Sequence, residues 1–486
     1  MFLQVDAIER DFMPRLAQLV SPYGRQRAFW VCIAATVLAK VTTIFFNGPL
    51  NAVQSTVDDA TRDWATLVQA VEMIVLALVA RRTPHLVASR PLTLAAGVCA
   101  VAGAVLAPLG VAHQNATILL AGSCLTASSI AWASVLWLVL CSSLEFRSLL
   151  VCFVAGGLAA IPLAWALAQG GYVFVVACYA ACVIGLLALC SWHTRRRFAD
   201  YAHAEAAADA EITRPRSVLP LTHDLFVYIF VFSLAYGFGL RYQNADGGLL
   251  GSWFMGAVLL AVLAYALGSR PAPRADVLFS LAFALLLGGF LLVLLDDAVL
   301  ASGASTALAC SNTVFGLLMT VALCTIAARS LSNALPSIAW GYAAYYVGIG
   351  LGAQTGIFVT GVAGTHSLLS RAVVALILGA VMLYTLFSIR DFGFDKTIAS
   401  VERDAPVPVV VEVQYEDRIA ARCQQLATSH GLTERETDVF GLLARGNNTL
   451  RIQEELSITK NTLKYHTRHI YEKLGVHSQQ ELIDLL

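Results

Sequence analysis

The chain has 486 residues, of which 58% are hydrophobic and only 13% charged, and its mean hydropathy is +0.70. Charged residues make up about a quarter of an ordinary soluble domain, so this composition excludes a chain that is soluble throughout and predicts a membrane protein. The 32 basic and 32 acidic residues give a formal net charge of zero, which indicates no particular class of partner.

Residues 1–27 are predicted to form a cytoplasmic N-terminal segment. They are rich in charged residues and contain no apolar core of the kind that a signal peptide needs near its start. We therefore expect the first apolar span to target the chain to the membrane.

Apolar segments of membrane-spanning length follow one another from residue 28 to residue 389. They predict an all-α fold, a polytopic bundle of twelve transmembrane helices (6+6) followed by a small soluble helix-turn-helix domain. The predicted spans are 28–47, 64–80, 92–112, 116–141, 148–168, 171–192, 223–240, 248–268, 275–295, 301–327, 337–361 and 367–389. The predicted domains are the first six-helix half (28–192), a cytoplasmic loop (193–222), the second six-helix half (223–389), a linker stiffened by prolines (390–415) and a C-terminal module (416–486).

Charged residues in the predicted loops divide between the two sides of the membrane. An even number of spans places both termini on the same side, and the loops on that side hold most of the arginines, whereas the opposite loops hold mainly acids. This positive-inside pattern predicts that both termini are cytoplasmic. The inner arginines are Arg81, Arg82, Arg90, Arg147, Arg195, Arg196, Arg197, Arg214, Arg216, Arg270, Arg274 and Arg329, and the outer acids are Asp58, Asp59, Asp63, Asp246, Asp296 and Asp297.

The two six-helix halves joined by a basic inner loop resemble the major facilitator superfamily. This resemblance implies a small-molecule cavity between the halves at mid-membrane depth. The inner-loop signature of that superfamily, Gly-x-x-x-Asp-x-x-Gly-Arg, is replaced here by the segment from Arg81 to His85. The departure bears on active transport more than on the fold.

Ionisable side chains inside predicted spans are the first candidates for a ligand site, because they are costly in a membrane. Lys40 in the first span and Glu72 in the second lie at about the same depth, roughly 10–12 Å below the outer surface at 1.5 Å per residue. Two readings stay open at this point: a salt bridge that joins the two spans, or a ligand- or ion-responsive pair that faces the cavity.

Further candidates lie near the outer end of the bundle and within it. Arg241 and Tyr242 end the seventh span, where they belong either to an ordinary interfacial belt or to a cavity mouth suited to an anionic or aromatic molecule. Trp132 in the fourth span and Asn312 in the tenth are weaker candidates. The glycines Gly348, Gly352 and Gly356 recur at the spacing of close helix packing rather than of a phosphate loop.

The sequence predicts no metal site, no cofactor and no enzymatic activity. The 11 cysteines lie mostly in apolar runs, none of them forms a Cys-x-x-Cys pair, and no His/Cys cluster has metal-ligand spacing. No catalytic constellation occurs, because the one Ser-x-x-Lys match, Ser457 to Lys460, falls on the predicted helix-turn-helix turn.

The C-terminal module reads as a set of short amphipathic helices. Thr433 and Glu436 form a capping box that begins the first helix, and Gly446 ends it. After a second helix, Thr459 caps a third, on which Leu463, Ile470 and Leu474 share the core face. Another face of this helix is basic, because it carries Lys460, Lys464 and Arg468 at a spacing of four residues. Lys473 lies on the same helix, whose single acidic residue is Glu472. A basic second helix after a short turn is typical of a helix-turn-helix that enters a major groove.

This module resembles the DNA-binding domain of LuxR-family transcription regulators. The matching motifs are Leu432-Thr433-x-Arg435-Glu436, Gly446, Ile452, Leu456, Ile458, Thr462-Leu463-Lys464-x-His466 and Ile470-x-x-Lys473-Leu474-Gly475-Val476. The resemblance implies that Lys464, Tyr465 and Arg468 face the groove, that Thr462 and His466 lie near phosphates, and that the chain forms a homodimer on DNA through 479–486. Two positions depart from the family pattern: 448–451 reads Asn-Thr-Leu-Arg instead of Ser-Asn-Lys-Glu, and Gln479 replaces an arginine.

Together these features predict a one-component transcription regulator in the bacterial cytoplasmic membrane. The membrane part senses an unidentified small molecule, and the C-terminal domain binds promoter DNA through Lys460, Thr462, Lys464, Tyr465, His466 and Arg468. A module that reads DNA must be cytoplasmic, which agrees with the arginine distribution. Two alternatives stay open: a major-facilitator-like transporter with an attached regulatory DNA-binding module, and a membrane part that only tethers the reader.

Overall fold

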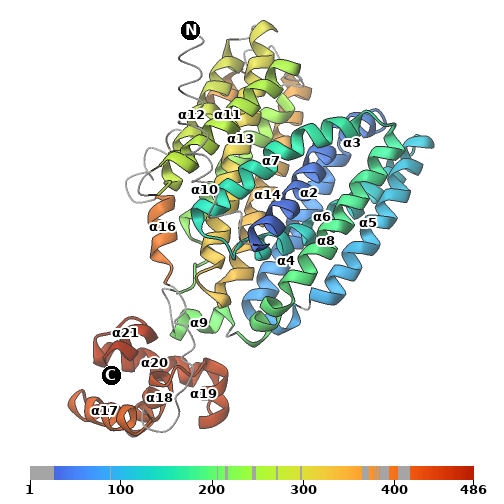
Figure 1. The fold of residues 1–486 in the computed structure, drawn as a ribbon. Helices are drawn as coiled ribbons and strands as arrows, with labels where there is room; N and C mark the ends of the chain where they lie inside the picture. Colours follow the sequence, from blue (N-terminus) through green and yellow to red (C-terminus); the bar gives the residue numbers. More distant parts are fainter. Residues whose placement is uncertain are drawn as a thin grey trace, which may run out of the picture.

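The protein is almost entirely helical (Figure 1). The computed structural model describes residues 27–87, 89–204, 206–213, 217–242, 248–269, 272–295, 298–363, 371–377, 379, 383, 393–402 and 416–485, and no strand occurs among them. This confirms the all-α class. The predicted N-terminal segment (apart from Arg27), most of the linker 390–415 and most of the twelfth predicted span 367–389 lie outside the described residues.

Nine helices within the described ranges are long and apolar enough to cross a membrane. This confirms a polytopic membrane part, while a count of twelve spans stays a prediction. The long helices comprise these nine and also α11 and α14. In chain order they are α2 (Arg27–Asn47), α4 (Thr61–Arg82), α5 (Ser89–Ala112), α6 (Ala116–Cys141), α7 (Phe146–Ala168), α8 (Tyr172–His203), α10 (Asp224–Tyr242), α11 (Gly248–Gly268), α12 (Ala275–Leu294), α13 (Ala298–Ala327) and α14 (Leu331–Ala363). Short helices between or after them are α3 (Pro49–Gln54), η1 (Pro84–Leu86), α9 (Ala207–Thr213) and α16 (Phe394–Ser400).

The observed helices match the predicted spans closely, with one informative extension. Helix α6 covers 116–141 and α11 covers 248–268, as the apolar runs predict. Helix α8 runs eleven residues beyond the predicted end at 192, because Arg195–Arg197 and the alanines after them are good helix formers outside the apolar span. The predicted loop 193–222 therefore begins as a helix.

Helix α5 shows why this bundle requires a lipid environment. Leu94, Val98, Val101 and Val105 recur every three or four residues along it, and each is more than half exposed. An exposed apolar stripe of this length is a liability in water and the ordinary surface of a helix that faces lipid. The opposite side of α5 packs closely on α6, where Gly103 and Gly110 let the two backbones approach.

The first and second halves of the bundle meet along α4 and α14, and also along α7 and α11. Within the second half, α14 packs on α10 through glycines. A Cβ on Gly352 would lie 2.1 Å from the carbonyl oxygen of Leu234, and one on Gly348 would lie 2.6 Å from that of Phe230. These contacts confirm close helix packing at the Gly348 and Gly352 positions of the predicted pattern.

Several arginines of the predicted inner loops form hydrogen bonds that join separate segments at one end of the bundle. Arg197 donates to the carbonyl oxygen of Val139 at the end of α6, and Arg147 donates to that of Ser269 after α11. Arg329 donates to the carbonyl oxygen of Val401 after α16. These guanidinium groups donate to carbonyls at or just after helix C-termini, where intrahelical donors run out.

The C-terminal helices form a separate small unit at the end of the bundle where α9 lies (Figure 1). This unit consists of α17 (Glu416–Ser429), α18 (Glu434–Ala444), α19 (Thr449–Leu456), α20 (Lys460–Leu474) and α21 (Gln479–Asp484). Helix α9, which belongs to the loop between the two halves, contacts both α4 and α14 on one side and α19 and α20 on the other.

Candidate nucleic-acid interface

Helix α18 begins with the predicted capping box. The amide of Glu436 donates to Thr433 Oγ1 at 3.3 Å, and the amide of Thr433 donates to Glu436 Oε2 at 2.7 Å. Lys473 Nζ donates to the same carboxylate at 2.6 Å and to the carbonyl of Gly431 at 3.0 Å. Burial by itself would raise the pKa of Glu436, but the hydrogen bonds from Lys473 and Thr433 hold this pKa below its usual value. Lys473 therefore fastens α20 to α18 and does not extend the basic face.

Local signals also determine where α19 and α20 begin and end. Asn448 caps α19 by accepting from the amide of Arg451 at 3.0 Å, so this departure from the family pattern keeps a good N-cap. Ser457 has a φ of 52°, which turns the chain between the two helices. Thr459 caps α20 by accepting from the amide of Thr462 at 3.3 Å, and Gly475 ends it at a φ of 67°.

One face of α20 is held in the small core of this unit. Leu463, Ile470 and Leu474 are buried, as their spacing predicts. They pack in one cluster with residues of α18, α19 and α21, which fixes the orientation of α20. The buried residues of this core are Cys423, Val439, Phe440, Leu442, Leu443, Ala444, Ile452, Leu463, Ile470, Tyr471, Leu474, Val476 and Leu482.

The predicted DNA-contacting side chains lie together on the outer side of α20. Lys460, Thr462, Lys464, Tyr465 and Arg468 are exposed, and the Tyr465 side chain is 60% exposed. His466 is half-buried. The structure thus presents five of the six predicted residues to solvent on one helix and places the sixth at the edge of the core.

Two neighbours on α20 modify this face. Arg468 Nε donates to Glu472 Oε1 at 2.9 Å, and this hydrogen bond lowers the pKa of Glu472. The ring of Tyr465 lies 4.3 Å from that of His469, centroid to centroid, which restricts the tyrosine side chain. Both contacts hold long side chains in place before a partner arrives.

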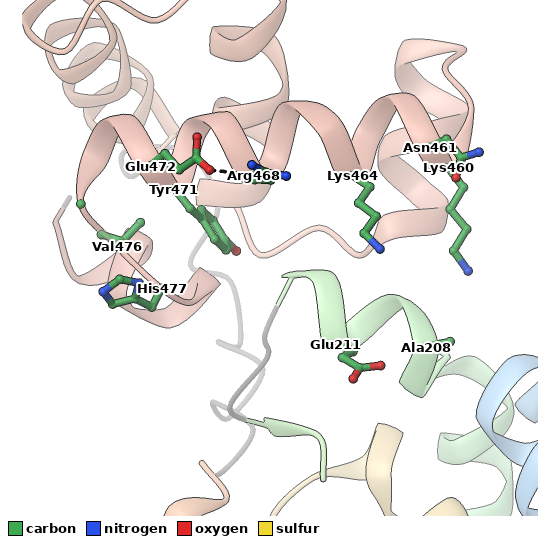
Figure 2. A pocket seen from close by; sticks show the side chains of 11 residues that line it. Ala208, Glu211, Lys460, Asn461, Lys464, Arg468, Tyr471, Glu472, Val476 and His477 are labelled. Carbon is green, nitrogen blue, oxygen red and sulfur yellow. Dashed lines mark hydrogen bonds and ion pairs between the residues drawn. The ribbon is translucent and has the colours of Figure 1, made fainter. Parts of the chain in front are cut away.

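Helix α9 lies opposite the basic face of α20 (Figure 2). Between them is a groove of about 900 Å³ whose lining includes Glu211, Lys460, Lys464 and Arg468. Lys460 Nζ forms an ion pair with Asp209 Oδ1. The sequence analysis did not predict this contact, because it treats 193–222 as a loop between the two halves.

Gln479, the second departure from the family pattern, is a buried structural residue. Its Nε2 donates to the carbonyl oxygens of Leu443 at 2.8 Å and of Asn447 at 3.3 Å. It therefore ties the start of α21 to the end of α18 and contributes no charge to the surface.

Lys40 and Glu72, the membrane candidates, have separate partners in this structure. The Lys40 ammonium lies 5.8 Å from the centroid of the Trp137 ring. Glu72 Oε1 accepts from Ser128 Oγ at 2.5 Å. No ion pair between Lys40 and Glu72 is formed among the residues that the structure describes. The salt-bridge reading of this pair thus finds no support in the observed contacts.

Arg241 forms a buried ion-pair cluster that sequence reasoning did not predict. Its Nε donates to Asp63 Oδ2 at 2.9 Å, and its Nη1 donates to Asp59 Oδ1 at 2.9 Å. A third hydrogen bond reaches the Asp59 carbonyl oxygen at 2.5 Å. The Arg241 and Asp63 side chains are only 5% and 3% exposed. Arg241 thus links α10 in the second half to α4 in the first.

The remaining candidates are spread over the bundle. Trp132 is buried, and its Nε1 donates to Thr93 Oγ1 at 3.0 Å, so it ties α6 to α5. Asn312 Oδ1 accepts from the Tyr345 hydroxyl at 3.3 Å and so joins α13 to α14. Tyr242 is the last residue of α10, and its side chain lies outside the described part. Lys40, Glu72, Arg241, Trp132 and Asn312 thus each contact a different partner.

Comparison with known proteins decides the class of the C-terminal unit. Residues 430–486 match the family described as bacterial regulatory proteins, luxR family. Residues 430–486 are a LuxR-type DNA-binding domain. Over 59 residues the chain is 39% identical to the HTH-type transcriptional regulator MalT of Yersinia pestis (strain Pestoides F) and to that of Serratia proteamaculans (strain 568). Each match covers 12% of this chain and only 6% of the relative, so the similarity to these regulators is confined to the LuxR-type domain.

Solved structures similar to the chain include membrane transporters. The human organic anion transporter MFSD10 (TETRAN) is 14% identical, covers 73% of this chain and 99% of its own, and has a TM-score of 0.47. The major facilitator superfamily proton:xylose symporter XylE, bound to 6-bromo-6-deoxy-D-glucose, is 12% identical, covers 74% of this chain and 94% of its own, and has a TM-score of 0.49.

Proposed function

We propose that this chain is a one-component transcription regulator embedded in the bacterial cytoplasmic membrane. Its membrane part, 28–389, senses a small molecule, and its C-terminal module, 416–486, binds promoter DNA. The observation that carries the proposal is the presence, in one chain, of a LuxR-type domain with an exposed basic helix and of a bundle whose described part holds nine helices suited to a membrane. The matched relatives are themselves named HTH-type transcriptional regulators, which supports the DNA-binding half.

The DNA-binding face consists of Lys460, Thr462, Lys464, Tyr465 and Arg468, with His466 at its edge. The lysines and the arginine neutralise phosphates and reach base edges, and the hydroxyl of Thr462 serves a phosphate. Helix α20 is 15 residues long, so about 22 Å of helix is available for the major groove. Its N-terminal turns carry most of these side chains, as a recognition helix requires.

Promoter binding by this domain requires a homodimer on two half-sites. The last helix, within 479–486, supplies the dimer contact, and exposed Leu485 is an apolar group suited to it. Two recognition helices then lie about 34 Å apart, one turn of B-DNA.

The topology follows from the position of the LuxR-type domain. It lies at the end of the bundle that holds Arg81 and α9, whereas the Arg241 cluster lies at the opposite end of α4. DNA is cytoplasmic, so the arginine-rich end faces the cytoplasm, in agreement with the positive-inside pattern. With twelve spans (6+6), both termini are cytoplasmic, and the halves are 28–192 and 223–389, joined by 193–222.

Glu72 is the best candidate for a sensing group within the membrane part. It is half-buried, lies near the middle of α4 and accepts from Ser128, and no cation of the described residues forms an ion pair with it. An intramembrane carboxylate without a cationic partner is suited to a cationic or hydrogen-bonding small molecule. Lys40, with Trp137 beside it, and Arg241 are the further candidate groups. A non-enzymatic role fits the absence of a catalytic constellation from the sequence.

The deciding test is transcriptome profiling of the host with the gene deleted and then restored as wild type, as Lys464→Ala/Arg468→Ala or as the control Arg435→Ala. Arg435 is an exposed residue of α18 away from the reading face. We expect a small set of genes to respond to the deletion, and wild type and the control to restore it, while the double variant does not. Full restoration by the double variant would refute DNA binding as the function and would favour a major-facilitator-like transporter.

A further inference from the structure

Helix α9 of the same chain faces the basic side of α20 across a groove, and Lys464 and Arg468 keep exposed side chains. Helix α9 lies across from Lys460, Lys464 and Arg468, and the groove between the two helices is lined from both sides (Figure 2). An α-helix with its side chains is about 10–12 Å in diameter, and the major groove of B-DNA is about 12 Å wide. The groove admits one helix, so α20 cannot enter it while α9 lies against the same face.

The covering helix is acidic where it meets the basic face. Asp209 pairs with Lys460, and the Asp209 side chain is only 11% exposed, because α9 packs it against the LuxR-type domain. Glu211, two residues further along α9, also lines this groove, as do Lys464 and Arg468, while it pairs with Arg81. The Asp209 carboxylate thus competes for a lysine that a phosphate of a DNA backbone would otherwise contact.

Helix α9 also contacts the membrane part, through α4 and α14. Glu211 Oε2 accepts from Arg81 Nη2 at 2.6 Å, which ties α9 to the end of α4 in the first half. Ala207 and Ala210 are fully buried and pack with Val218 in the chain that leads to the second half. Helix α9 further contacts α14, so its position depends on how the two halves are arranged.

We infer that α9 (Ala207–Thr213) is an internal acidic partner of the LuxR-type domain that blocks its DNA-binding face and links it to the state of the membrane bundle. The structure described here is the closed, DNA-excluding state. A change in the relative position of α4 and α14 withdraws α9 and frees α20, which gives the membrane part a physical route to DNA binding. The inference rests on the proposed function, because it assigns a regulator to the same face.

The test is DNA affinity of the full-length protein in lipid nanodiscs, with a fluorescent mixed-sequence duplex of about 20 base pairs at low salt as the probe. Asp209→Asn/Glu211→Gln removes the acidic contacts, and Arg81→Gln removes the tie to α4 without touching α20. Exposed ion pairs change an equilibrium by a few-fold each, so we expect about tenfold tighter binding for the double variant and about threefold for Arg81→Gln. The matched control Glu434→Gln/Asp438→Asn removes the same two negative charges from α18 and is expected to change affinity less than twofold.

Two further measurements separate the outcomes. Lys464→Ala/Arg468→Ala defines the baseline without the reading face, and hydrogen exchange of 206–213 reports whether DNA displaces α9. Faster exchange in this segment on addition of DNA supports the inference. The inference would be overturned if wild type, Asp209→Asn/Glu211→Gln and Arg81→Gln bound DNA with equal affinity, all above the baseline. Unchanged exchange with DNA bound would overturn it as well. In both cases DNA binding itself stands. Affinity at the baseline for every variant would overturn the proposed function as well.

Discussion

The Arg241 cluster provides a quantitative test of how the two halves are held at the end opposite the LuxR-type domain. The change Arg241→Met removes the guanidinium but keeps a side chain of similar length. It leaves the Asp63 carboxylate, 3% exposed, without its main cation, whereas Asp59 at 62% exposed keeps water. Breaking a buried pair in this way costs about 3–5 kcal/mol. Arg62, whose Nη2 lies 3.4 Å from Asp63 Oδ1, compensates in part, so we expect the lower end, about 3 kcal/mol.

A cost of about 3 kcal/mol corresponds to a factor of about a hundred in the population of the opened state. We expect amide hydrogen exchange in 57–66, which covers the first turn of α4, to speed up by about that factor in full-length protein in nanodiscs. The control Arg82→Met removes an exposed arginine from the other end of α4 and leaves this rate unchanged. In the double variant Arg241→Met/Asp63→Asn no carboxylate is stranded, so its exchange is slower than in Arg241→Met. Unchanged exchange in Arg241→Met, or additive effects in the double variant, would refute the assignment of this cluster as a lock between the halves.

Four further outcomes follow from particular contacts. Gly352→Leu places a Cβ 2.1 Å from the Leu234 carbonyl oxygen, so we expect the melting temperature in detergent to fall by several degrees. The control Gly361→Leu leaves the melting temperature unchanged, because nothing lies within 4 Å of a Cβ at that position. Gln479→Ala removes the side-chain donor to the carbonyls of Leu443 and Asn447, while the Leu443 carbonyl keeps the Gly446 amide, so we expect a cost of about 1 kcal/mol, seen as faster exchange in 442–447, whereas Gln480→Ala has little effect. The pKa of Glu436 is lowered in the folded state, so this carboxylate stabilises α18 fully at a pH above its ordinary pKa, and the stabilisation is lost as the pH falls through the lowered pKa. We therefore expect the hydrogen-exchange protection factors of 434–444 to decrease with acid in wild type and to change less in Glu436→Gln. Lys464→Ala lowers the slope of log affinity against log salt by about 1, and a slope equal to that of wild type and of Arg435→Ala would contradict a phosphate contact.

Local patterns in the sequence predicted most of the secondary structure and the class of the C-terminal domain. The capping box at Thr433, the N-cap at Thr459 and the spacing of Leu463, Ile470 and Leu474 depend on residues within a few positions of one another. Apolar runs predicted the long helices for the same reason, since the membrane sets their length. The basic face of α20 also follows from spacing along a single helix.

Only the tertiary structure decided which distant groups meet. Arg241 and Asp63 are 178 positions apart in the chain, and their contact exists because α10 and α4 lie side by side in the bundle. Lys460 meets Asp209 because a loop between the halves folds back under the LuxR-type domain, which no periodicity reveals. Lys473 and Gln479 read as surface groups in the sequence, yet the first holds Glu436 and the second caps α18. Charge and hydropathy indicate what a side chain can do, but its partner depends on the packing of whole helices against one another.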